Sequence, residues 1–172
     1  MAEQGALFID ADEVVNDLYK PQQEGWRKIV NYFGNQYLLK SGAINRKKLG
    51  KFVFNDQNKL KILNFLIHPL VTNQIQKILD KTKEKYIAIE ATYFEKKGLL
   101  KFVDKVIWID CSKEILLKRT LKKKVLTAKM FGQILKSQQK PEKIDFIVTN
   151  NGSRKDLHVQ LKKIWQKCMM SA

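Results

Sequence analysis

Four short apolar runs, rich in β-branched residues, divide the chain and predict strands. They lie at residues 6–9, 86–89, 106–109 and 146–149. None of them alternates between apolar and polar positions, a pattern typical of strands that are buried on both faces of a parallel sheet. We therefore expect a parallel sheet that helices cover on both sides.

Helical patterns separate these runs. The first has its apolar positions on one helix face, at Trp26, Ile29, Val30 and Phe33. Gly34 then marks the end of that helix. Ser112 is placed to cap a later helix, and Ser153 with Asp156 forms a capping-box pattern before the last one. The apolar stripe of this last helix is Leu157, Leu161, Ile164, Trp165 and Cys168.

Residues 20–80 show helical patterns and no clear strand, which predicts a helical lobe after the first strand. Within it, His68 and Pro69 interrupt a long apolar pattern. Because proline disfavours the helical conformation in the residue before it, we expect a break or kink at His68. The order of elements predicts an α/β fold, a doubly wound parallel sheet with a helical lobe, as one domain over residues 1–172.

Composition places the chain among ordinary globular proteins, with 172 residues of which 44% are hydrophobic. No apolar run approaches the roughly 20 residues that a membrane span needs. The opening MAEQGALF has no signal-peptide pattern. The two cysteines, Cys111 and Cys168, indicate reduced thiols and not a disulfide framework. We therefore expect a protein of the cytoplasm or an organelle matrix, with no membrane partner.

The net charge of +16, from 33 basic and 17 acidic residues, is the unusual property of the composition. Only four of the basic residues are arginines, at positions 27, 46, 119 and 154. One interpretation is a compositional bias toward lysine. The other is attraction of a polyanion such as a nucleotide, a coenzyme or RNA. Specific reading of bases favours arginine, so the charge by itself indicates phosphate attraction at most.

Six stretches carry a resemblance to a known family. They are IDADEVV (9–15), GAINRKKLGKFVF (42–54), LNFLIHPLV (63–71), EATYFEKKGL (90–99), LLKRTL (116–121) and NNGS (150–153). In sequence, order and spacing they resemble the bacterial dephospho-coenzyme A kinases. That family transfers the γ-phosphate of ATP to the ribose 3′-hydroxyl of dephospho-CoA, the last step of coenzyme A synthesis. The resemblance implies a P-loop kinase-like fold, with residues 20–80 as the lobe that binds the acceptor.

The resemblance also implies roles on the acceptor side. Asp10 matches the aspartate that acts as base toward the acceptor hydroxyl, although a helix N-cap is the alternative role for a carboxylate in this position. Asp12 is better explained as a favourable charge in the first helical turn. Arg46 and His68 match residues of the lobe that holds the coenzyme, and Glu95 is expected to anchor the acceptor side.

On the nucleotide side, the resemblance places the adenine of ATP at Asn150, Asn151 and Gly152, after the last strand. Arg119 begins the lid, about residues 119–135, where nucleotide kinases clamp the transferred phosphate with arginine. ATP and Mg²⁺ are the cofactors of the family, and no protein ligand for a metal is assigned.

Two departures from the family concern the phosphates. The 172 residues contain no G-x-x-x-x-G-K-[ST] motif, whose amides and lysine hold the phosphates in such kinases. We expect the chain to begin roughly 25 to 30 residues late relative to the family, and so to lack the first strand and phosphate loop of a sheet ordered 2-3-1-4-5. In the lid, Lys123, Lys124 and Val125 stand where the family usually has arginine followed by acidic residues, and lysine cannot form a bidentate fork.

Three hypotheses follow. The first is a dephospho-CoA kinase that is inactive as this chain alone. The second is a non-catalytic basic binding or scaffold subunit, for instance with RNA in a ribonucleoprotein. The third is a module that binds dephospho-CoA or CoA-like ligands without phosphorylating them. For the missing strand we expect either that the remaining strands move together and close the sheet, or that a protein partner supplies a strand by β-augmentation.

Overall fold

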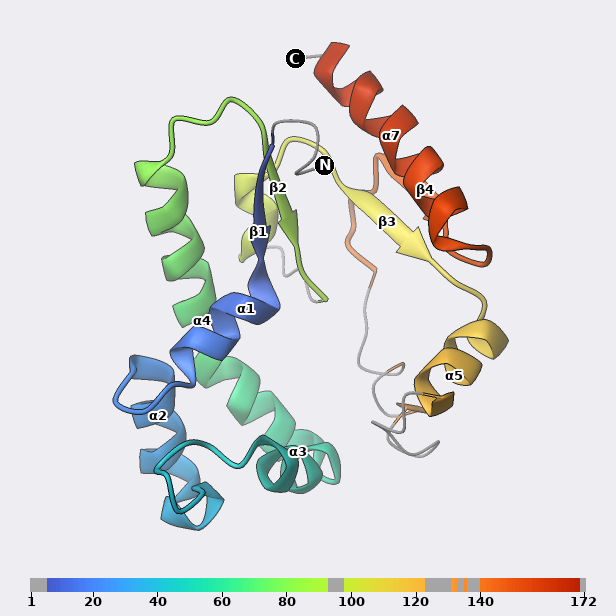
Figure 1. Ribbon diagram of the computed structural model, residues 1–172. Helices are drawn as coiled ribbons and strands as arrows, with labels where there is room; N and C mark the ends of the chain where they lie inside the picture. Colours follow the sequence, from blue (N-terminus) through green and yellow to red (C-terminus); the bar gives the residue numbers. More distant parts are fainter. Residues whose placement is uncertain (1–5, 93–97, 123–130, 133–134, 136–139, 171–172) are drawn as a thin grey trace. The chain divides into compact units, whose positions relative to one another are not determined.

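The computed structural model describes residues 6–92, 98–122, 131–132, 135 and 140–170. The chain forms two compact units, which are described separately (Figure 1). The N-terminal unit is Leu7–Phe94, and the C-terminal unit is Glu95–Ala172 together with Met1–Ala6. The expectation of a single domain stays a prediction.

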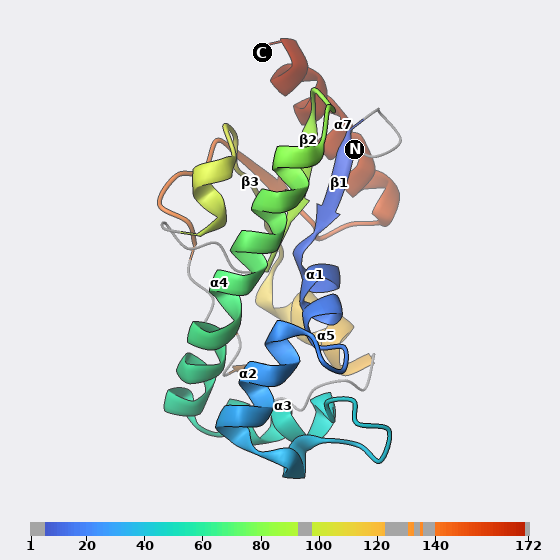
Figure 2. The ribbon, with the colours of Figure 1, turned by 90° about the vertical axis from the view of Figure 1, so that its left-hand side faces the viewer.

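The N-terminal unit combines two parallel strands with a group of helices. Strand β1 (Leu7–Asp10) pairs in parallel with β2 (Ile87–Glu90), with Leu7 opposite Ile87 and Asp10 opposite Glu90. The longest helix, α4, contacts each of the other three α-helices of this unit (Figure 2). The helical elements are α1 (Ala11–Leu18), α2 (Glu24–Phe33), η2 (Asn35–Tyr37), α3 (Arg46–Phe54) and α4 (Gln57–Lys81).

Short polar side chains fix where three of these helices begin. Asp10, Asn45 and Asp56 accept hydrogen bonds from backbone amides in the first turns of α1, α3 and α4. This satisfies amides that have no partner within the helix. At the other end of α2, Gly34 adopts φ of +90°, a conformation that suits glycine. The predicted end of this helix at Gly34 is confirmed.

The core of the helical lobe is apolar and partly aromatic. The rings of Phe33, Tyr37 and Phe52 pack against one another, with centroids 5.1 to 6.3 Å apart. Ile29 in α2 and Ile75 in α4 are fully buried. Residues 20–80 are helical apart from turns and one isolated bridge between Leu38 and Ile44, so the predicted helical lobe is confirmed.

Of the expected break or kink at His68, the break is wrong, because α4 continues through Pro69 to Lys81, and the kink stays a prediction. Proline cannot donate to the carbonyl four residues earlier, which belongs to Phe65. Both Pro69 and Phe65 are exposed, the latter at 79%. Water can therefore bond the carbonyl that the proline leaves without its helical partner. Burial of Ile67, Leu70 and Val71 on the inner face favours continuation of the helix.

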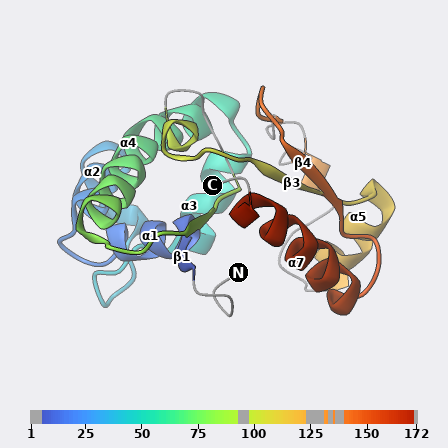
Figure 3. The same cartoon turned by 90° about the horizontal axis from the view of Figure 1, so that it is seen from above.

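The C-terminal unit contains a second parallel pair. Strand β3 (Ile107–Asp110) pairs with β4 (Phe146–Thr149), with Ile107 opposite Phe146 and Asp110 opposite Thr149. Helix α7 contacts β4 and lies beside the strand pair (Figure 3). The other elements of this unit in the described ranges include η3 (Leu99–Phe102), α5 (Lys113–Lys122) and α7 (Arg154–Met170).

Both predicted caps of this unit are confirmed. Ser112 Oγ accepts from the amide of Ile115 at the start of α5. Before α7, Ser153 Oγ accepts from the Asp156 amide at 3.2 Å, and the Asp156 carboxylate accepts from the Ser153 amide at 2.8 Å. The predicted stripe of α7 is its inner face, with Trp165 buried and the other four residues half-buried.

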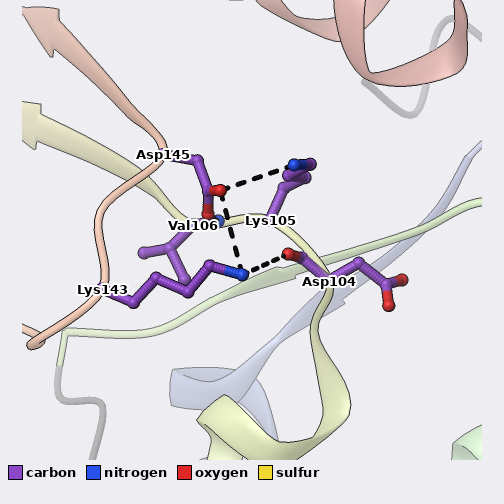
Figure 4. A network of polar contacts seen from close by, with 5 residues as sticks. All are labelled: Asp104, Lys105, Val106, Lys143 and Asp145. Atoms are coloured by element: carbon purple, nitrogen blue, oxygen red, sulfur yellow. Dashed lines mark hydrogen bonds and ion pairs between the residues drawn. The ribbon is translucent and has the colours of Figure 1, made fainter. Parts of the chain in front are cut away.

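One aspartate joins the entry of β3 to the entry of β4 (Figure 4). The Asp145 carboxylate accepts from the Val106 amide at 2.8 Å and lies 3.5 Å from Lys105 Nζ. Lys143 Nζ lies 3.9 Å from the same carboxylate and donates to the Asp104 carbonyl at 3.0 Å. The Val106 amide, with the two lysines, holds the pKa of Asp145 below its ordinary value.

All four predicted strands exist, within one residue of the expected bounds, and both observed pairs are parallel. The pairs are β1 with β2 and β3 with β4, whereas the expected order 2-3-1-4-5 and the omission of its first strand stay predictions. Burial on both faces is wrong for three positions, because Phe8, Ile109 and Ile147 are 45%, 48% and 62% exposed. In the described ranges each sheet has only two strands, so these side chains have no third strand beside them to cover them. The helices of the described part include none that is long and apolar enough to cross a membrane.

Candidate functional site

The polar residues of interest follow the carboxyl ends of the parallel strands. Asp10 and Glu90 are register partners at the ends of β1 and β2. Asp110 and Thr149 are partners at the ends of β3 and β4. Ligands of open α/β sheets bind outside the carboxyl ends of strands, so each unit presents candidate residues at the edge where a ligand is expected.

Asp10 links the end of β1 to the start of α1. Its Oδ1 accepts from the amides of Asp12, at 2.8 Å, and Glu13, at 3.4 Å. The N-cap role considered for Asp10 is therefore confirmed. Both bonds end on Oδ1, so a base role for the second oxygen, Oδ2, is compatible with capping. Asp12 lies in the first turn of α1, where its charge favours the helix dipole as expected.

Glu90 is a residue that sequence reasoning did not select. It occupies the same position on β2 that Asp10 occupies on β1, and its side chain is exposed. The sequence contains a pattern that could have indicated Glu90, because Asp10 and Glu90 each follow three apolar residues at the end of a strand. Its importance depends on strand pairing, which the sequence pattern alone does not reveal.

Arg46, at the start of α3, is held against the far end of α1. Its guanidinium carbon lies 4.8 Å from the centre of the Tyr19 ring, and Nη1 donates to Asn16 Oδ1. Burial raises the pKa of Tyr19 to about 12, against the opposing effect of Arg46, so the phenol is uncharged at neutral pH. Neither Asn16 nor Tyr19 was predicted, since no motif marks residues that support an arginine from another helix.

The other predicted acceptor residues are placed less completely. His68 is half-buried on α4, next to the buried Ile67. Glu95 and most of the lid after Lys122 lie outside the described residues. An open groove of about 370 Å³ separates α4 from the α1–α2 connection, and none of the predicted site residues lines it. Its lining is Leu18, Gln23, Glu24, Leu70, Asn73, Gln74, Gln76 and Lys77.

On the nucleotide side, the structure brings Arg119 together with the loop that follows β4, residues 150–152. Arg119 Nη1 donates to the carbonyl of Asn150 at 2.7 Å and to its Oδ1 at 3.2 Å. Nη2 donates to the carbonyl of Gly152 at 2.8 Å. The predicted residues Arg119, Asn150 and Gly152 therefore form one hydrogen-bonded group.

Three further contacts define the shape of this loop. Asn151 Oδ1 accepts from the Ser112 amide at 2.8 Å, which connects the loop to the start of α5. Cys111 Sγ lies 3.3 Å from the Asn150 carbonyl. A Cβ on Gly152 would come within 2.6 Å of Asp156 Oδ2, the oxygen that caps α7. A side chain at position 152 would therefore require the Asp156 carboxylate to shift.

Nothing in the described part of the chain forms a group of three or more His, Cys, Asp or Glu side chains suited to a metal ion. The Mg²⁺ that accompanies nucleotides is usually held by one or two carboxylates together with phosphates and water. A full set of protein ligands is thus not what such a site requires.

The chain is similar to known dephospho-CoA kinases. The dephospho-CoA kinase family model matches residues 1–156. The dephospho-CoA kinase of Fusobacterium nucleatum is 31% identical, with 98% of this chain and 87% of that protein covered. That of Geobacillus kaustophilus is 30% identical, with 95% and 85% covered.

Solved structures give the same result. A dephospho-CoA kinase from Campylobacter jejuni matches with a TM-score of 0.58 and 28% identity, over 97% of this chain and 87% of that one. The protein TT1252 from Thermus thermophilus shares the fold, with a TM-score of 0.68 at 19% identity over 96% and 86% of the two chains. The chain belongs to the dephospho-CoA kinase family.

Proposed function

We propose that this chain carries the residues of a dephospho-CoA kinase that bind dephospho-CoA and those that bind the adenine of ATP. The reaction is transfer of the γ-phosphate of ATP to the 3′-hydroxyl of dephospho-CoA. The observation that carries the proposal is the family match over residues 1–156, with Asp10 at the carboxyl end of a parallel strand. In the proposed doubly wound P-loop kinase sheet, that edge faces the ligands.

Asp10 is proposed to act on the acceptor hydroxyl. Its Oδ1 is fixed by the amides of α1, which orients the carboxylate and leaves Oδ2 for the substrate. Oδ2 accepts the proton of the 3′-hydroxyl while the hydroxyl oxygen bonds to the γ-phosphorus. The bond from that phosphorus to the bridging oxygen breaks, and ADP leaves with the electron pair. Such transfer depends mainly on positioning and charge stabilisation.

Other residues of the chain are proposed to bind the two substrates. Arg46, supported by Tyr19 and Asn16, carries the fixed positive charge for the acceptor's phosphates, and His68 contributes from α4. Glu95 is proposed to anchor the acceptor, and the 150–152 loop to hold the adenine. Bound Mg²⁺ would neutralise charge on the ATP phosphates, and we assign no residue of this chain as its ligand.

The proposal includes inactivity of the 172-residue polypeptide when it is assayed alone. Its eight glycines include no pair in the arrangement G-x-x-x-x-G-K. Without the amides and lysine of that loop, the transferred phosphate has few groups to hold it. A strand–loop–helix segment that carries the motif, supplied in the same chain or by a partner, is expected to complete the site.

A coupled assay with Mg²⁺, ATP and dephospho-CoA tests this proposal. We expect negligible turnover for the 172 residues alone. A fusion that places a G-x-x-x-x-G-K-[ST] strand–loop–helix segment before residue 1 should turn over at roughly 1 to 100 per second, as kinases do. Turnover in that range by the 172 residues alone would contradict the inactivity, though not the reaction.

Two matched variants of the fusion test the role of Asp10. Asparagine retains N-cap ability but cannot accept a proton, so Asp10→Asn should reduce kcat by roughly 10²- to 10⁴-fold with little loss of stability. Asp12→Asn removes a neighbouring charge from the same helical turn and should change kcat little. A fusion that binds neither substrate would overturn the proposed function itself.

The RNA-binding alternative keeps one supporting observation, the net charge of +16. The family match supplies no observation in favour of RNA binding. A positive charge that attracts phosphates also suits a kinase, because both of its substrates are polyanions. The dephospho-CoA kinase reaction is therefore the function that we propose.

A further inference from the structure

The 150–152 loop is held by an arginine from a different element of the C-terminal unit. Arg119 lies in the last turns of α5, 31 residues before Asn150. Through two of its nitrogens it bonds three oxygens, the carbonyls of Asn150 and Gly152 and the side-chain Oδ1 of Asn150. These oxygens converge on one guanidinium, so the loop conformation depends on that side chain.

The chemistry of these contacts requires arginine. The planar guanidinium presents donors in a fixed fork, whereas the lysine ammonium is a point charge on a flexible stem. The neighbouring basic residues on the same helix, Lys118 and Lys122, are lysines. Most of the 33 basic residues of the chain are lysines as well. An arginine at this position in a lysine-rich chain matches a geometry that lysine cannot satisfy.

The same contacts orient the side-chain amide of Asn150. Arginine only donates hydrogen bonds, so the atom of the amide that faces it must be the oxygen. The Nδ2 group is then directed away from Arg119 with two N–H donors to offer. A ring nitrogen of a purine is an acceptor that fits such a donor.

We propose that Arg119 is a positioning residue for nucleoside recognition, which acts through the 150–152 loop and does not clamp the transferred phosphate. This inference rests on the proposed function, because it takes the loop as the site of the ATP base. It predicts that loss of Arg119 weakens every adenine ligand by the same factor, whatever the number of phosphates. A phosphate clamp predicts the opposite, a loss confined to ATP.

Titration of adenosine, AMP and ATP into the full 172-residue chain distinguishes the two roles. Measurements by calorimetry or ligand-observed NMR would compare the wild type with Arg119→Lys and Arg119→Ala. We expect both variants to bind all three ligands about tenfold more weakly, since hydrogen bonds to charged groups contribute at that scale. Lys118→Gln removes an exposed charge from the same helix and should leave all three affinities within twofold.

A second readout follows the loop itself in the same proteins. The Ser112 amide bonds to Asn151 Oδ1, so its hydrogen exchange reports whether the loop keeps its position. Faster exchange is expected in Arg119→Lys and not in Lys118→Gln. Unchanged adenosine binding with weaker ATP binding, or unchanged binding of all three, would overturn the inference while the proposed function stands. A wild-type chain that binds neither adenosine nor ATP would instead overturn the nucleotide site on which it rests.

Discussion

Arg46, which we propose binds the acceptor, is held in place by two neighbouring side chains. Its guanidinium lies over the Tyr19 ring and bonds to Asn16, so two residues at the end of α1 fix a side chain at the start of α3. A fixed guanidinium loses less conformational freedom when it binds an anion than a free one does. If Arg46 binds the acceptor as proposed, the ring face of Tyr19 supports that binding as well.

We expect Tyr19→Ala to weaken binding of dephospho-CoA by roughly 2- to 30-fold, the range that a cation–π contact contributes. Tyr19→Phe retains the ring and should change the affinity less than twofold. Because burial raises the pKa of Tyr19 to about 12, the phenylalanine variant removes no charge at neutral pH. Calorimetric titration of both variants checks this, and equal losses in the two would show that the hydroxyl, and not the ring, supports Arg46.

The sequence marked the candidate residues of the site but not the residues that contact and support them. Asp10 and Arg46 stand in recognisable motifs, and Asn150 with Gly152 follows an apolar strand. Tyr19, 27 positions before Arg46, carries no such signal, because its role depends on how α1 and α3 pack. The bonds from Arg119 to the loop were equally unpredictable, since they depend on the pairing of β3 with β4.

At the scale of elements, local rules predicted most of the structure. Each strand followed from an apolar run, and the caps at Ser112 and Ser153 from short-range hydrogen-bonding patterns. The predicted break at His68 was wrong because a local rule for proline was outweighed by burial along the inner face of α4, and the alternative of a kink there stays a prediction. The prediction of burial on both faces was wrong for Phe8, Ile109 and Ile147, because burial depends on neighbours that a single run does not specify.

Asp145 gives the β3–β4 pair a dependence on pH. In the folded chain the Val106 amide and two lysines lower its pKa, whereas the unfolded chain has the ordinary aspartate value. Protons therefore bind the unfolded state more readily. The free energy of unfolding rises with pH between the lowered pKa of the folded chain and the ordinary pKa of the unfolded chain. The stabilisation is present above the ordinary aspartate pKa of about 4. It is lost as pH falls through the lower folded value.

We expect Asp145→Asn to lower the thermal stability of the chain at pH 7, because the amide cannot attract Lys105 and Lys143. The difference from wild type should shrink below about pH 4, where the wild-type carboxylate is protonated as well. Asp104→Asn is the matched control, since Lys143 bonds to the backbone carbonyl of Asp104 and not to its carboxylate. Thermal unfolding at several pH values measures this, and a difference that persists unchanged to pH 2 would contradict the electrostatic explanation.

The chain forms two compact units, and within the described residues each has a parallel sheet of two strands. Isolated two-stranded sheets are marginally stable in water, and three or more strands or a covering helix are needed. The exposure of Phe8, Ile109 and Ile147 is consistent with sheets that have room for further packing. The sheet order that the resemblance predicts, 2-3-1-4-5, has its first strand between the strands that would correspond to β2 and β3.

We therefore expect a strand–loop–helix segment of the kinase type to stabilise the 172-residue chain, whether fused before residue 1 or added in trans. A strand that pairs with both β2 and β3 supplies partners for backbone groups of each, and each new buried hydrogen bond contributes about 0.5 to 1.5 kcal/mol. Thermal unfolding should shift upward and become sharper. The control is the same segment with proline in the middle of its strand, where it cannot pair. Equal stabilisation by both segments, or none by either, would contradict insertion of a central strand.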